Sequence, residues 1–170
     1  SYIPLWIQVT RLDRPIGWMV LLWPTWIALT LAGFSANEFK PDTWVIFTLG
    51  VIITRSAGCV INDLTDRKFD KYVKRTQARP ITTGNLSVKN AVTVAIILLI
   101  TAFFLVLQTN QQTIYLSFIA LGLAIVYPWI KRITFWPQIG LGLGFSMAIP
   151  MSFTAYEQPI DRIVWALFLG

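Results

Sequence analysis

The stretch that decides the fold is Trp44–Asp70, WVIFTLGVIITRSAGCVINDLTDRKFD. Its first part, Trp44–Ile61, is mostly apolar and is interrupted by a single charge, Arg55. A run of about 20 apolar residues is long enough to cross a bilayer as a helix. Its second part, from Asn62, is rich in acidic residues at helical spacing. We therefore expect one helix that leaves the membrane and continues through Asp70.

The composition agrees with a membrane protein. The chain has 170 residues, of which 55% are hydrophobic and 13% charged, and its mean hydropathy is +0.62. A soluble domain normally carries about a quarter charged residues. Cys59 is the only cysteine and histidine is absent, which excludes an internal disulfide and a Cys/His metal cluster.

Other runs of similar length predict further spans. The five runs are Ile16–Phe34, Trp44–Ile61, Ala91–Leu107, Ile114–Ile130 and Ile133–Ala155. A sixth begins at Ile163 and is still apolar at Gly170. We predict an all-α fold, a polytopic transmembrane helix bundle with about five complete spans and the start of a sixth. We expect one transmembrane domain over residues 1–170 that is truncated at its C-terminus.

Basic residues gather on one side of this alternating topology. They are Arg11, Arg14, Arg67, Lys68, Lys71, Lys74, Arg75, Arg79, Lys89, Lys131 and Arg132. The other side holds only Lys40 and Arg162. Because positive charge stays on the cytoplasmic side, we expect the basic side to face the cytoplasm of a bacterial inner membrane, or the matrix of a mitochondrion. The net charge of +6 is then a topology signal, and no nucleic-acid partner is expected.

Acidic residues follow the second span at helical spacing. On a helix that continues to Asp70, Arg55, Asn62, Asp66 and Asp70 share one stripe, and Asp63 joins Asp66 and Asp70 in a second, offset set. Side chains one turn apart have Cβ atoms about 5–6 Å apart, a separation at which carboxylates can share a cation. Mg²⁺ takes oxygen ligands and commonly bridges carboxylates to the phosphates of a substrate. The pattern predicts a magnesium site.

Three basic residues, Lys74, Arg75 and Arg79, follow the acids and can bind phosphate oxygens. Acids, Mg²⁺ and bases beside a membrane bundle describe a site for a diphosphate whose tail lies among membrane lipids. Two other classes stay open. A transporter could line an ion path with the same polar stripe, and a scaffold could use the basic segment to bind anionic lipids.

The acidic motif also resembles a known family. NDLTDRKFD (62–70), followed by KRTQARP (74–80), resembles the first aspartate-rich motif of the UbiA superfamily of intramembrane prenyltransferases. RLDRPIGW (11–18), AGCVIND (57–63) and YPWIKR (127–132) resemble the 4-hydroxybenzoate polyprenyltransferases of ubiquinone biosynthesis. The resemblance implies Mg-dependent transfer of a polyprenyl group from its diphosphate to the ring of 4-hydroxybenzoate, ortho to the hydroxyl. Menaquinone, haem O and chlorophyll branches of the superfamily stay open as alternatives.

The resemblance assigns roles position by position. Asn62, Asp66 and Asp70, with Asp63 as a further candidate, would hold Mg²⁺ and form the catalytic set. The residues expected at the diphosphate are Lys74, Arg75, Arg79, Lys131 and Arg132. Arg55 and Tyr127 would approach the aromatic substrate.

The chain departs from the family pattern in one respect. The family has a second aspartate-rich motif in a later cytoplasmic loop, whereas after Arg132 this sequence offers only Glu157 and Asp161. The predicted topology places both on the opposite side of the membrane. We therefore expect the 170-residue chain alone to be inactive.

Overall fold

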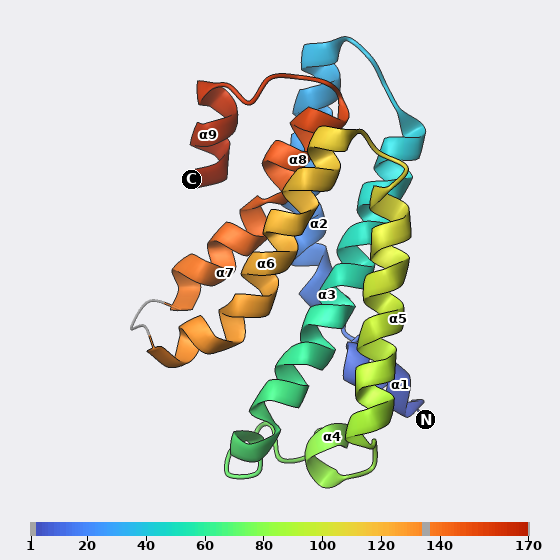
Figure 1. Ribbon diagram of the computed structural model, residues 1–170, viewed down its shortest axis with the longest axis vertical. Coiled ribbons are helices and arrows are strands. Elements are labelled where there is room, and N and C mark those ends of the chain that lie inside the picture. The colour runs from blue at the N-terminus through green and yellow to red at the C-terminus, as the bar shows by residue number, and fades with distance from the viewer. Residues whose placement is uncertain (1–2, 134–136, 170) are drawn as a thin grey trace. The chain divides into compact units, whose positions relative to one another are not determined.

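The computed structural model describes residues 3–133 and 137–169, and the side chains of residues 3–127 and 138–169. Within those residues the chain forms nine helices and no strand, which confirms the predicted all-α fold (Figure 1). The helices are α1 (Leu5–Thr10), α2 (Ile16–Ala36), α3 (Pro41–Asp70), α4 (Pro80–Thr83), α5 (Val88–Val106), α6 (Gln111–Ile133), α7 (Pro137–Ser146), α8 (Ala148–Ala155) and α9 (Arg162–Leu169).

Three helices, α2, α3 and α5, are long and apolar enough to cross a membrane. Helix α6 contains a shorter apolar segment, Gln111–Tyr127. The fifth predicted run, Ile133–Ala155, is not one helix, because a break at Met147 separates α7 from α8. Pro150 lies in the first turn of α8, and a proline there has no N–H to bond to the preceding turn. With its three long apolar helices, the chain is an integral membrane protein.

By its internal contacts the chain divides into two compact units, and the division falls within α2, α3 and α5. The first unit comprises the residues up to Trp18 together with Ile52–Phe103. The second comprises Met19–Val51 and the residues from Phe104 onward.

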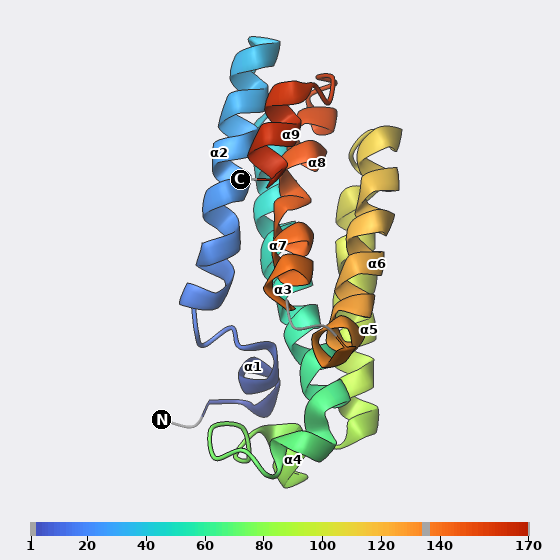
Figure 2. The ribbon, with the colours of Figure 1, turned by 90° about the vertical axis from the view of Figure 1, so that its left-hand side faces the viewer.

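Four helices contribute to the core of the first unit. The buried side chains are Val9 of α1, Val60 of α3, Ile81 of α4, and Ala91 and Ala95 of α5. Figures 1 and 2 show α1 beside α4, near the C-terminal end of α3. The core therefore holds the residues just before α2 against the segment that follows the acidic motif.

The second unit packs α2, the start of α3, α8 and α9 around Leu29, Phe47, Phe153 and Val164. Helix α2 ends in a Schellman motif, in which Asn37 has φ 51°, its N–H bonds to Phe34 O and the N–H of the next residue bonds to Gly33 O. This motif turns the chain sharply into α3.

Candidate active site

An ion-paired cluster lies at the C-terminal end of α3. Arg79 Nη1 is 2.9 Å from Asp63 Oδ1 and 2.7 Å from Asp70 Oδ2. Arg11 Nη2 is 2.6 Å from the same Asp63 oxygen. Asp63 and Asp70 are seven residues apart, two turns of one helix face, as the helical spacing predicts. Two carboxylates and two guanidinium groups therefore form a continuous chain of opposite charges.

The segment between α3 and α4 is a series of turns that places Arg79. The Thr76 hydroxyl is buried and donates to the backbone carbonyl of Asp70 at 3.2 Å. The N–H of Arg79 donates to Thr76 O, and Arg79 is the residue before α4, whose first residue is Pro80. Proline suits the first position of a helix because that N–H has no partner within the helix. The backbone of Arg79 is therefore fixed on both sides.

Asn62 and Asp66 lie one turn apart on α3 and are partly buried. Asp63 and Asp70 are buried. Among the described residues, no three side chains of the His, Cys, Asp and Glu types come together as a metal site. Mg²⁺ is commonly held by one or two carboxylates together with substrate phosphates rather than by a protein cage. The side-chain oxygens on α3 are therefore the residues here that could hold a magnesium ion together with a phosphate ligand.

Arg55 lies two turns before Asn62 and is partly buried. Its Nε donates to Gly17 O at 3.2 Å, and its Nη1 donates to Cys59 Sγ at 2.9 Å. Within the described part of the chain, no carboxylate lies within 4.0 Å of its guanidinium group. An Arg with no acidic partner inside a membrane helix is costly, and this arrangement is suited to an anionic ligand.

The remaining predicted residues divide into two groups. Lys74 and Arg75 are exposed in the turns after α3. Tyr127 is partly buried in α6, which belongs to the second unit. Lys131 and Arg132 are in the same helix, and their side chains lie outside the described residues.

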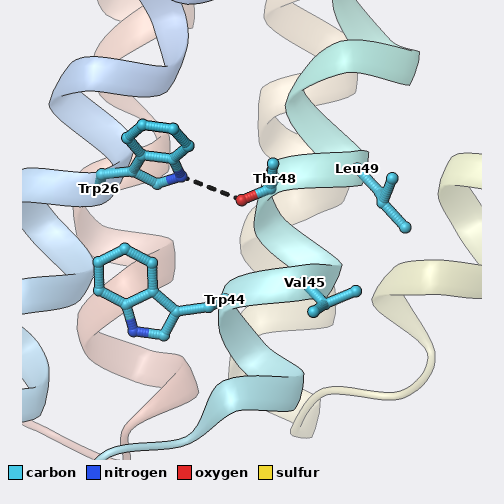
Figure 3. Close-up of a pocket in the computed structure, with 5 residues that line it drawn as sticks. All are labelled: Trp26, Trp44, Val45, Thr48 and Leu49. Atoms are coloured by element: carbon cyan, nitrogen blue, oxygen red, sulfur yellow. Dashed lines mark hydrogen bonds between the residues drawn. The ribbon is translucent and has the colours of Figure 1, made fainter.

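The second unit carries an apolar surface hollow, lined by Trp26, Trp44, Val45, Thr48 and Leu49 (Figure 3). The Trp26 indole N–H donates to Thr48 Oγ1 at 3.0 Å, toward α3. No charged side chain lines this hollow. It therefore lacks the groups that would bind a diphosphate.

The two late acidic residues have local structural settings. Asp161 caps α9, because its Oδ1 accepts hydrogen bonds from the backbone N–H groups of Ile163 and Val164. Glu157 is exposed, with φ 57°, at the end of α8.

Arg11 is the functional candidate that sequence reasoning missed. Its place among the basic residues of one membrane side predicts only a role in topology, yet it contacts Asp63 across 52 positions of sequence. The available signal is Asp63 itself, because a carboxylate at the end of a membrane span needs a cationic partner. The sequence does not say which of the many basic residues supplies it.

Comparison with known proteins finds a matching family and several similar proteins. The model of the UbiA prenyltransferase family matches residues 21–170. The chain is 51% identical over 167 residues to a 4-hydroxybenzoate octaprenyltransferase of Tolumonas auensis, covering 98% of this chain and 57% of that protein. It is also 51% identical over 171 aligned residues to the protein of the same name from Alcanivorax borkumensis, covering 99% of this chain and 58% of that protein.

The fold has a counterpart among solved structures. A UbiA homologue from Archaeoglobus fulgidus, bound to DMAPP and Mg²⁺, superimposes with a TM-score of 0.80 at 20% identity, over 97% of this chain and 59% of that chain. This chain thus spans a little over half the length of the relatives it matches. The family model covers most of the sequence, so the chain belongs to the UbiA prenyltransferase family.

Proposed function

We propose that the full-length protein transfers a polyprenyl group from polyprenyl diphosphate to 4-hydroxybenzoate, with Mg²⁺, in ubiquinone biosynthesis. The observation that carries the proposal is the polar stripe of α3, in which oxygen donors follow an arginine that has no carboxylate partner among the described residues. The near relatives named 4-hydroxybenzoate octaprenyltransferase support this choice of acceptor. We place the reaction at the cytoplasmic side of a bacterial inner membrane.

Residues at the C-terminal end of α3 and just after it would hold the metal and the diphosphate. Asn62, Asp66 and Asp70 would provide oxygen ligands to Mg²⁺, and the bound ion would supply positive charge to stabilise the diphosphate leaving group. Lys74 and Arg75 are exposed beside this end of α3, where they would donate to phosphate oxygens. Lys131, Arg132 and Tyr127 remain further candidates for the substrate pocket. The polyprenyl chain of the substrate would lie among membrane lipids.

Arg55 would orient the aromatic acid. Its Nη2 has no partner among the described residues and its Nη1 bonds only to the Cys59 sulfur, a weak acceptor. Both nitrogens can therefore turn to one carboxylate, as guanidinium groups commonly do. The C–O bond electrons pass to the diphosphate, the ring carbon ortho to the hydroxyl forms the new C–C bond, and the proton on that carbon passes to the released diphosphate. A bundle that excludes water protects the allylic cation from hydrolysis.

The test is a reconstitution of the full-length protein in liposomes with a polyprenyl diphosphate and 4-hydroxybenzoate. We expect prenylated 4-hydroxybenzoate and released diphosphate in equal amounts, and loss of both when EDTA removes Mg²⁺. Product formed only with another aromatic or haem acceptor would assign the protein to a different branch of the family. Ion flux without consumption of prenyl diphosphate would contradict the enzyme and support a transporter.

A further inference from the structure

Arg11 belongs to none of the groups assigned above, yet it contacts the most deeply buried acid of the motif. Its side chain is 29% exposed and that of Asp63 is 3% exposed. A buried carboxylate is costly unless it is paired and hydrogen-bonded. Asp63 Oδ1 accepts a hydrogen bond from Arg11 and lies 2.9 Å from Arg79 Nη1, so this oxygen has two cationic partners.

The backbone of Arg11 is held in a demanding conformation. Helix α1 ends in a Schellman motif, in which the N–H of Arg11 bonds to Gln8 O and the N–H of Leu12 bonds to Ile7 O. Arg11 is the left-handed residue of this motif, with φ 55°, where glycine is the usual residue. The buried Val9 anchors the same turn to the core. The turn therefore directs an arginine side chain to Asp63 at a position where local geometry alone favours glycine.

Arg79 uses only one of its nitrogens within the described protein. Its Nη1 contacts both Asp63 and Asp70. No described residue accepts a hydrogen bond from its Nε or Nη2. Those two donors are left for a ligand, and their direction is set by the two carboxylates that hold Nη1.

We infer that Arg11 is a positioning residue that acts through Asp63 on Arg79. By neutralising Asp63, Arg11 leaves Arg79 shared between two carboxylates instead of being drawn wholly to the more buried one. Arg79 then presents Nε and Nη2 to the diphosphate in a fixed orientation. Asp63 serves in this arrangement as the anchor of two arginines. This inference rests on the proposed function, because it assigns a diphosphate to Arg79.

The test uses the full-length protein in nanodiscs, with geranyl diphosphate and Mg²⁺ as the probe. We expect Arg11→Met to weaken binding of the probe by about tenfold, the loss typical of one charge-assisted hydrogen bond. The KM for the prenyl diphosphate should rise by a similar factor while the KM for 4-hydroxybenzoate stays the same. Arg11→Lys, which keeps the charge, should recover part of the loss.

Arg14→Met is the matched control, because Arg14 lies in the same segment, is 79% exposed and only faces Asp13 at 3.8 Å. It should bind the probe as the wild type does. Arg11→Gly separates positioning from capping, since glycine is favoured at this backbone conformation. We expect this variant to keep the turn, and Asp63 to keep Arg79 as its remaining ion-pair partner, while the affinity for the probe still falls. Adding Asp63→Asn to Arg11→Met should restore part of the affinity, because the acid that competes for Arg79 is then neutral.

The outcomes distinguish the inference from the function on which it rests. If the wild type does not bind the probe with Mg²⁺, the proposed function fails. If the wild type binds and Arg11→Gly binds equally well, Arg11 has no positioning role. Equal losses for both substrates in Arg11→Gly and Arg11→Met would show a purely structural role and would also overturn the inference.

Discussion

Arg79 Nη1 lies 2.7 Å from Asp70 Oδ2, so one guanidinium group ties the last residue of α3 to the segment that leads into α4. The same nitrogen reaches Asp63. The side chain of Asp70 is 9% exposed, that of Asp63 is 3% exposed and that of Arg79 is 20% exposed. Removing one partner from such a buried network leaves the other charges uncompensated.

Arg79→Met should therefore destabilise the protein strongly. We expect a loss on the order of 3 kcal/mol, the range for breaking one partner of a buried ion pair, seen as a lower Tm of the detergent-solubilised protein. Arg75→Met is the control, because Arg75 is exposed in the same turn-rich segment, and its Tm should stay near that of the wild type. Equal Tm values for Arg79→Met and Arg75→Met would contradict a stabilising network.

Asp66→Asn tests the metal assignment. Asp66 lies one turn from Asn62 and, in the proposed function, provides a charged ligand that an amide replaces poorly. We expect turnover of the full-length protein to fall by on the order of 10²–10³-fold, the range for losing one electrostatic stabiliser of a transition state, and the dependence on Mg²⁺ concentration to weaken.

Asp42→Asn is the control for this substitution. Asp42 is an exposed acid in the first turn of the same helix. The same chemical change at that position should leave turnover and the Mg²⁺ titration unaltered. Near-normal activity of Asp66→Asn would remove Asp66 from the metal site.

The course of α3 and its acidic stripe could be predicted from the sequence. The apolar run fixed the membrane part, and the spacing of Asp63 and Asp70 placed them on one helix face, as their shared contact with Arg79 shows. These predictions succeeded because they depend on helical periodicity, which acts over a few residues. The break between α7 and α8 was not predicted, although Pro150 was a local signal for it.

The partners of the acids could not be predicted in the same way. Arg11 and Asp63 are separated by 52 positions, and their contact depends on how α1 packs against the first unit's core. Helices α1 and α4 are also too short to show a periodic pattern. Their burial comes from tertiary contacts, through Val9 and Ile81, rather than from local propensity.

Arg55→Ala tests the binding of the aromatic acid. We expect the KM for 4-hydroxybenzoate to rise by about 10- to 100-fold, which corresponds to losing a hydrogen bond to a charged group, while the KM for the prenyl diphosphate changes little. The KM of Arg55→Lys for 4-hydroxybenzoate should lie between that of the wild type and that of Arg55→Ala. An ammonium group keeps the charge but cannot bind a carboxylate through two fixed donors.

An acceptor without the carboxylate provides the control for Arg55. A simple phenol should be used equally poorly by the wild type and by Arg55→Ala, since the group that Arg55 would bind is absent. A similar rise in KM for both substrates of the transferase would instead indicate that Arg55, through Gly17 O, only supports the packing of α2 and α3.

Gly33→Ala tests the sharp turn between α2 and α3. A Cβ at Gly33 would lie 2.9 Å from the backbone oxygen of Glu38 and 3.4 Å from Cε1 of Tyr156. The backbone cannot retreat easily, because the Glu38 N–H is bonded to Gly33 O and Tyr156 OH accepts from the Lys40 N–H. We expect a loss of about 1–3 kcal/mol from overpacking, measured as a lower Tm.

Gly50→Ala is the matched control within the same unit. A Cβ at Gly50 meets nothing within 4 Å among the described residues. Alanine is favoured over glycine inside a helix by up to about 1 kcal/mol, so this variant should keep or raise the Tm. Because both substitutions add one methyl group to a helix, the difference between them isolates the contact with Glu38, and Tm values that change in parallel would show that the turn tolerates a side chain at Gly33.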